Sequence, residues 1–186
     1  MVARKVNGFT LLELLVSATI IAVLAGVGIP AWGDLVARQK ADAIAYRLHK
    51  GLTNARSTAV SNSAQVTLCG SRDGLTCARD QIAYLLSYVD RDNNHRLDAS
   101  EPLLQRLRIG DSHNNLRLSA SLGRSYLVFN RDGSARQAGS FIYCPASRHR
   151  NAARRVTLSL PGRAYIARDR NGDGVVELTS GRPISC

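Results

Sequence analysis

The amino-acid sequence predicts an α+β fold in which one long N-terminal helix packs on a C-terminal antiparallel β domain. Two observations support this prediction. Residues 9–61 have the composition and spacing of one helix, apolar on all sides at first and amphipathic afterwards. The rest of the chain contains short β-rich segments separated by turn residues, so helix and strands are segregated and do not alternate.

The first part of the predicted helix is a candidate membrane span. Residues 9–29 carry one charged side chain, and a helix of that length extends about 30 Å, the thickness of the hydrocarbon core of a bilayer. Arg4 and Lys5 precede the span, so the positive-inside rule places the N-terminus in the cytoplasm and the rest of the chain outside. Gly8 lies before the apolar stretch, so cleavage between Gly8 and Phe9 would remove a basic leader, residues 1–8, and keep the anchor.

Glu13 is the charged residue within the span. A carboxylate in lipid is costly, and it indicates a functional residue with a partner. If Phe9 becomes the mature N-terminus, its free amine in one subunit is a suitable partner for Glu13 of the next. The alternative is an ordinary signal anchor that contains a glutamate by chance.

The helix is predicted to continue from Pro30 through an amphipathic segment, residues 30–62. Apolar side chains recur there at steps of three and four residues, with basic side chains off this stripe. The apolar stripe should pack on the β domain. Its members are Ala41, Ile44, Ala45, Leu48, Leu52, Ala55 and Ala59.

Short strands are predicted throughout the β domain, residues 63–186. Turn sequences such as residues 130–133 and 161–162 separate them. The predicted strands are residues 65–69, 84–89, 103–109, 125–129, 141–144, 155–160, 164–167 and 175–178.

The four cysteines all lie on the predicted outer side of the membrane, where disulfides persist. Four cysteines allow three pairings. We expect Cys69 to pair with Cys77, because two glycines allow the short loop between them to turn, and Cys144 to pair with Cys186, which ties the C-terminus to a strand end. A zinc site is the competing use, but the chain lacks a CxxC pair.

The chain is strongly basic, with a formal net charge of +11. Its basic residues are mostly arginines, and a cluster of arginines that neutralises phosphates gives salt-dependent, sequence-independent DNA binding. The alternative is a solvated basic face, or one that meets acidic surfaces of neighbouring subunits. The candidate DNA-binding residues are Arg148, Arg150, Arg154, Arg155, Arg163, Arg168 and Arg170.

An acidic segment, residues 90–101, has oxygen-bearing side chains at positions 1, 3, 5, 9 and 12, the spacing of an EF-hand calcium loop. Position 6, normally glycine, is His95, and the flanking segments are predicted strands. A calcium loop and a polar hairpin loop are therefore both consistent with the sequence, which indicates no other cofactor. Residues 169–174 repeat the first half of the pattern, but Ser180 stands at the closing position. The candidate ligands are Asp90, Asp92, Asn94, Asp98 and Glu101.

The residues from Gly8 to Glu13 resemble the class III signal of type IV pilins and type II secretion pseudopilins. This resemblance implies that a prepilin peptidase cleaves after Gly8 and methylates the new N-terminal Phe9. It also implies that Glu13 pairs with a neighbour's N-terminus during assembly and that Pro30 kinks the helix.

The order of later landmarks resembles the GspH/FimT group of type IV minor pilins and type II secretion minor pseudopilins. The landmarks are a Cys-to-Cys loop, residues 88–94, 129–133, 143–144 and 159–163, and a terminal cysteine. The resemblance implies a pilin-like fold, an inner-membrane anchor in lipid, an inner-membrane assembly platform, and assembly with other pilins or pseudopilins into a periplasmic fibre. In some pilus members a Gly-Arg-x-Arg motif contributes to DNA binding in natural transformation. Gly162 and Arg163 match that motif, and Tyr165 stands at its fourth position.

The sequence does not indicate an enzyme. The histidines have no serine or cysteine nucleophile in a recognisable context, and the sequence contains no glycine-rich phosphate loop. Paired carboxylates, which could act as a general acid and base, occur only inside the two calcium-like segments.

Overall fold

The computed structural model describes residues 10–110, 115–145, 150–178, 180–184 and 186, without the side chains of residues 27–31 and 150. The chain divides into two units, Met1–Ala37 and Arg38–Cys186. Helix α1, Leu11–Ser61, contributes to both.

The first unit contains the N-terminal part of α1. The backbone N–H of Glu13 donates to Thr10 Oγ1 (3.3 Å), so Thr10 caps the helix with the acidic residue in the first turn. Apolar side chains such as Leu14, Ile21 and Leu24 are more than half exposed. Among the described residues, the structure holds no helix with the length and hydropathy of a membrane span. The span predicted at residues 9–29 starts before the described residues, and the side chains of residues 27–29 are not described, so the span stays a prediction.

The second unit is built around the remaining part of α1. Every member of the predicted apolar stripe is buried, with exposed fractions between 0% and 3%, which confirms the predicted inward face. The helix lies close to the strand Tyr84–Val89, because a Cβ at Gly51 would overlap Leu85 Cδ2. The helix ends where Ser63 adopts a left-handed backbone and the N–H of Ala64 donates to the carbonyl of Ala59 (3.1 Å).

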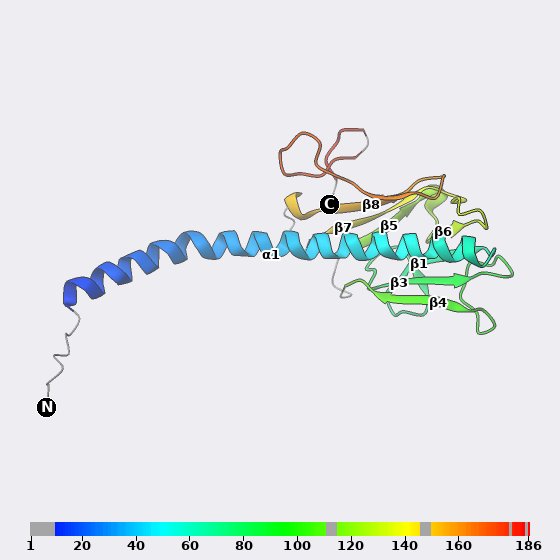
Figure 1. Ribbon diagram of the computed structural model, residues 1–186, viewed down its shortest axis with the longest axis horizontal. Helices are drawn as coiled ribbons and strands as arrows, with labels where there is room; N and C mark the ends of the chain where they lie inside the picture. The colour runs from blue at the N-terminus through cyan, green and yellow to red at the C-terminus, as the bar shows by residue number, and fades with distance from the viewer. Residues whose placement is uncertain (1–9, 111–114, 146–149, 179, 185) are drawn as a thin grey trace, which may run out of the picture. The chain divides into compact units, whose positions relative to one another are not determined.

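Two antiparallel sheets complete the second unit (Figure 1). In the first, β1 (Val66–Ser71) pairs with β2 (Cys77–Ala78) and β6 (Tyr126–Phe129) on one side and with β3 (Tyr84–Val89) on the other, followed by β4 (Leu103–Arg108). The second sheet has the order β5 (Asn115–Ala120), β7 (Gly139–Cys144), β8 (Arg154–Leu158) and β9 (Ala164–Ile166). Two short 3-10 helices, Ser121–Gly123 and Arg150–Ala152, lie in connections. The predicted α+β fold is confirmed.

The structure differs from the predicted strands in two ways. It contains β2 and β5, which were not predicted: β2 has two residues, and β5 alternates buried Leu116 and Leu118 with exposed polar side chains. The strand predicted at residues 175–178 is wrong, because that segment forms a single bridge between Glu177 and Pro183. Its apolar residue Val176 instead joins Ile184 in a small buried cluster.

The two predicted turns meet each other. Gly133 and Gly162 both have left-handed backbones, and a Cβ at Gly162 would overlap the carbonyl oxygen of Gly133. The N–H of Ala135 donates to the carbonyl of Leu160 (2.8 Å), which joins the same two turns. Glycine is required at position 162 for both its backbone conformation and its close contact.

Both expected disulfides are present. Cys69–Cys77 links β1 to β2 with a Cα–Cα distance of 5.5 Å, and Cys144–Cys186 links β7 to the C-terminus with a distance of 5.7 Å. Each ties down a segment with little regular structure.

Candidate functional site

The predicted processing site, Gly8 and Phe9, lies outside the described residues, as does the side chain of Pro30. Glu13 is described. Within the described part of the chain its carboxylate has no hydrogen-bond partner, and Leu12 and Leu14 beside it are exposed. The arrangement is a charged side chain on an exposed apolar helix surface.

The arginine cluster is divided by the structure. Arg148 and the side chain of Arg150 lie outside the described residues. Arg154 is engaged internally: it pairs with Asp42 of α1 and donates to the carbonyls of Asn151 and Ala153. Arg154 is therefore not available for a partner in this arrangement.

The remaining arginines lie on and after the β8–β9 hairpin. Arg155 is half-buried and donates to Thr157 Oγ1 (3.2 Å), whereas Arg163, Arg168 and Arg170 are exposed. Arg155, Arg168 and Arg170 line a hollow of about 300 Å³ together with Tyr165, which is 43% exposed. Asp169 and Glu177 line the same hollow, so this surface combines arginines, two carboxylates and an accessible aromatic ring. Tyr143, in contrast, is buried.

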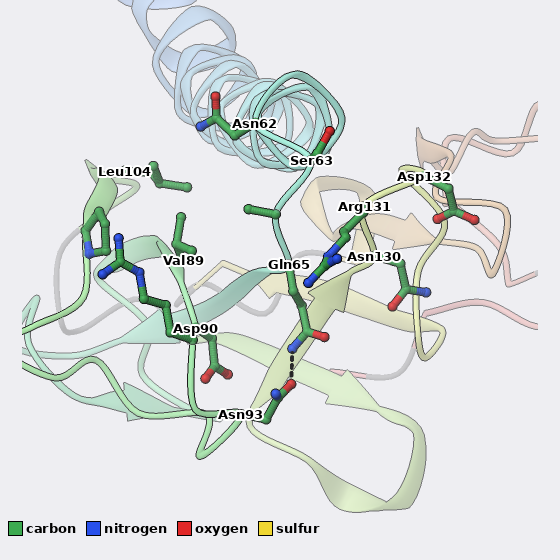
Figure 2. Close-up of a pocket in the computed structure, with 13 residues that line it drawn as sticks. Asn62, Ser63, Gln65, Val89, Asp90, Asn93, Leu104, Asn130, Arg131 and Asp132 are labelled. Atoms are coloured by element: carbon green, nitrogen blue, oxygen red, sulfur yellow. Dashed lines mark hydrogen bonds between the residues drawn. The ribbon is translucent and has the colours of Figure 1, made fainter.

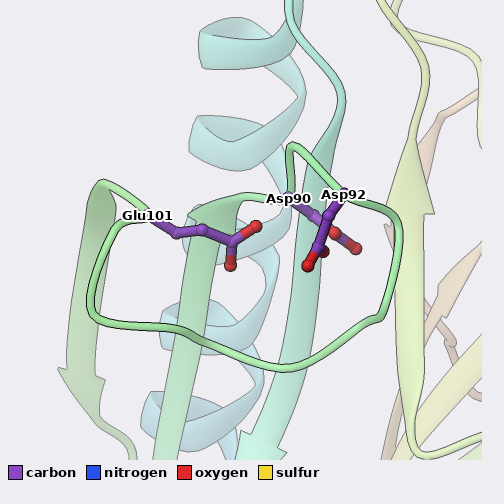
Figure 3. Close-up of side chains that lie close together, drawn as sticks. All are labelled: Asp90, Asp92 and Glu101. Atoms are coloured by element: carbon purple, nitrogen blue, oxygen red, sulfur yellow. The ribbon is translucent and has the colours of Figure 1, made fainter.

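The 90–101 loop connects β3 to β4 and brings three of the five predicted ligands together. Side-chain oxygens of Asp90, Asp92 and Glu101 lie within 4.8 Å of one another (Figure 3). Asp98 and Asn94 are joined to the cluster by hydrogen bonds: Asn94 Nδ2 donates to Asp92 Oδ2 (2.8 Å) and to Asp98 Oδ2 (2.7 Å). The loop, which joins the antiparallel strands β3 and β4, therefore gathers its carboxylates into a compact group.

Two carboxylates of the loop are buried. Asp90 is 3% exposed and Glu101 is 8% exposed. Asp90 Oδ2 accepts hydrogen bonds from Thr67 Oγ1 (2.9 Å) and from the N–H of His95 (3.2 Å), and it lies 2.8 Å from Nδ1 of the His95 ring. Burial raises the pKa of the Tyr88 phenol above its ordinary range, and the charges of Asp90, Glu101 and Asp98 raise it further.

The sequence did not indicate Thr67 or Tyr126 as parts of this site. Thr67 comes from β1, and Tyr126 from β6 stacks on His95 with 4.0 Å between ring centroids. Both residues reach the loop through strand pairing, which places distant segments side by side.

The loop also borders an open groove of about 790 Å³ near the end of α1. Figure 2 shows Gln65 Nε2 donating to Asn93 Oδ1 across this groove. Gln65 Oε1 accepts in turn from Arg136 (2.8 Å). The groove wall therefore depends on the conformation of the 90–101 loop.

A second acidic group contains Asp169, Asp173 and Glu177. Glu177 is 8% exposed and accepts from the N–H of Arg170 (3.0 Å), which is the interaction that Glu101 makes with the N–H of Arg91 (2.8 Å). Glu177 thus occupies the place that Glu101 has in the first loop, at the last ligand position, where the sequence spacing had placed Ser180.

Comparison with known proteins adds two family matches. Residues 45–162 match the family model described as type II transport protein GspH, and residues 3–29 match the prokaryotic N-terminal methylation motif. No match was found among curated proteins.

Two solved structures have a similar fold, and both are crystal structures of the type IV minor pilin FimU of Pseudomonas aeruginosa. The form in space group P65 is 20% identical, covers 68% of this chain and 92% of that chain, and has a TM-score of 0.51. The form in space group P21 is 22% identical, covers 80% of this chain and 96% of that chain, and has a TM-score of 0.50. At these identities the similarity shows the fold alone.

Proposed function

The chain belongs to the GspH family, and on that premise we propose that it is assembled into a periplasmic fibre by a type II secretion system or a type IV pilus. Family membership makes it a minor pilin or pseudopilin, a structural protein and not an enzyme. Its proposed partners are other pilins or pseudopilins, a prepilin peptidase and an inner-membrane assembly platform.

The N-terminal motif supports a processing and anchoring step. The methylation-motif match covers residues 3–29, which include Gly8, Phe9 and the apolar stretch. We infer that the leader 1–8 is removed, Phe9 is methylated, and residues 9–29 anchor the chain in the inner membrane as a single pass. Residues 30–62 and the β domain 63–186 would then lie in the periplasm.

The observation that carries the proposal is the surface around Glu13. Leu11, Leu14 and Leu15 are 79%, 63% and 56% exposed, so this segment of the helix does not bury them within the chain. Lipid can cover the apolar side chains, but a carboxylate in lipid needs a positive partner. The N-terminal amine of a neighbouring subunit satisfies Glu13 when the apolar helices bundle.

Replacing Glu13 tests this role. Glu13→Gln keeps the shape of the side chain and removes its charge, so the variant should remain in the membrane fraction and be lost from sheared fibres. Ser17→Ala is the matched control, because Ser17 lies one turn away and donates to the carbonyl of Glu13 (2.7 Å). Fibre incorporation of Glu13→Gln at the wild-type level would contradict the proposal.

A second candidate function is DNA binding, as a pilus-associated minor pilin that takes part in DNA uptake for natural transformation. One observation favours it: the exposed Arg163, Arg168 and Arg170 accompany the exposed ring of Tyr165. Arginines can neutralise phosphates, and an accessible aromatic ring can stack on bases.

A gel shift with the purified chain tests this candidate. The double variant Arg163→Gln/Arg168→Gln should weaken binding and reduce its salt dependence. Arg79→Gln/Arg131→Gln removes the same charge from two other exposed arginines and serves as the control. Equal binding by both double variants, or no binding by the wild-type chain, would exclude the candidate.

A further inference from the structure

The 90–101 loop carries an inference that is independent of fibre assembly. We infer that Asp90, Asp92 and Glu101 form the centre of a calcium-binding site. Three carboxylates from one loop converge to within 4.8 Å (Figure 3). Like charges at this separation repel one another, and a bound cation removes that repulsion.

A buried oxygen without a partner points to a ligand. Asp90 Oδ1 is buried and has no hydrogen-bond partner within the described part of the structure, although Oδ2 of the same carboxylate has three. A buried carboxylate oxygen without a donor is costly. A cation coordinated by Oδ1 compensates for its lost hydration.

The available ligands are those of a hard cation. Asp90, Asp92, Asn94, Asp98 and Glu101 occupy positions 1, 3, 5, 9 and 12 of the loop and supply oxygen atoms. Glu101 accepts one backbone hydrogen bond on each oxygen, from Arg91 (2.8 Å) and Asp98 (3.3 Å). Each carboxylate oxygen has a second lone pair, so these contacts orient Glu101 and still allow coordination. A loop with this many oxygen ligands suits calcium better than magnesium, which requires near-ideal octahedral geometry.

His95 satisfies the requirement at position 6 that glycine usually meets. Its backbone is left-handed, with φ of 60°, and its N–H donates to Asp90 Oδ2 (3.2 Å). Such a backbone costs a residue with a Cβ about 1–2 kcal/mol. The ring offsets this cost, because Nδ1 lies 2.8 Å from Asp90 Oδ2 and the ring stacks on Tyr126. The side chain that departs from the EF-hand pattern therefore holds the first ligand in place.

The 169–177 loop provides a matched comparison within the same chain. It has left-handed backbones at Gly172 and Gly174, and the N–H of Gly174 donates to Asp169 Oδ2 (2.7 Å), as that of His95 does to Asp90. In this described loop, however, the structure shows no buried carboxylate oxygen without a partner. The 90–101 loop is therefore the one we assign to calcium.

The test uses the full-length chain purified in detergent, stripped with EDTA and heated with and without calcium chloride. We expect 5 mM calcium to raise Tm by about 3–6 °C, because ligand that binds the native state stabilises it by mass action. Asp92→Asn should weaken the calcium affinity at least about tenfold, and its exposed side chain leaves the fold intact without metal. Asp173→Asn should keep the wild-type calcium response.

Three results would overturn the assignment. They are the absence of a calcium shift in the wild-type chain, an undiminished shift in Asp92→Asn, and an equal shift with 5 mM magnesium. Circular dichroism of each variant in EDTA confirms that its fold is retained. A titration calorimetry experiment on the wild-type chain and Asp92→Asn measures the affinity ratio directly.

Discussion

The two parts of α1 use the same kinds of apolar residue for different purposes. In the part that begins at Arg38, Leu48 and Leu52 are 1% and 0% exposed. In the part before it, Ile21 and Leu24 are 65% and 67% exposed. The second part is covered by the β-sheets of its own chain. The exposed apolar side chains of the first part are the surface that, in the proposed fibre, neighbouring helices cover.

The largest difference between the two parts should appear in the free energy of unfolding. Leu52→Ala removes a fully buried side chain and should destabilise the second unit by about 2–5 kcal/mol, because it leaves a cavity. Leu24→Ala should change the stability of the isolated chain by less than about 0.5 kcal/mol. Urea unfolding monitored by circular dichroism measures both. Equal losses for the two variants would contradict the comparison.

Alanine substitutions at glycines in the two parts of α1 should give a smaller difference in stability. Gly51→Ala should destabilise the chain by about 1 kcal/mol, because the cost of crowding Leu85 exceeds the gain in helix propensity. Gly26→Ala has open space around its Cβ and should be neutral or stabilising. The same urea experiment distinguishes them, and a stabilising Gly51→Ala would show that α1 does not lie as close to β3 as described.

The smallest expected effect is a pH dependence of stability that comes from Asp73 in the second unit. Backbone N–H groups of Thr76 and Leu75 donate to the Asp73 carboxylate and hold its pKa well below its usual range. Because the folded pKa is lowered, this contribution is present above the unfolded pKa of about 4 and is lost as the pH falls below it.

The difference in Tm between the wild-type chain and Asp73→Asn should therefore shrink between pH 5 and pH 2. Asp80→Asn removes the same charge nearby and controls for the loss of one carboxylate. If the Tm difference between the wild-type chain and Asp73→Asn stays constant across that range, the charge of the Asp73 carboxylate does not stabilise the loop closed by Cys69 and Cys77.

The sequence predicted those features that depend on local spacing. The period of the apolar stripe fixed the inward face of α1, and carboxylate spacing found Asp90, Asp92 and Glu101. Features that depend on strand pairing were missed. Strand β5 was overlooked because its two-residue period rests on two apolar residues, Leu116 and Leu118, and its pairing with β7 is a long-range contact.

The surroundings of the acidic loop could not be predicted for the same reason. Thr67 lies 23 positions before Asp90, and Tyr126 lies 36 positions after it. Strand pairing brings both to the site. The ion pair of Arg154 with Asp42 is also a long-range contact. Sequence reasoning could not predict it and therefore placed Arg154 among the candidate DNA-binding arginines.

Photo-crosslinking from position 14 tests the central claim most directly. A photoreactive amino acid in place of Leu14 should form covalent adducts with other pilin subunits in cells that assemble fibres, and these adducts should disappear when Glu13→Gln is added. The same probe in place of Tyr46, an exposed residue of the second part, serves as the comparison. If the chain enters sheared fibres but position 14 yields no subunit adducts, the first part of α1 is not covered by neighbouring subunits, and the account is wrong.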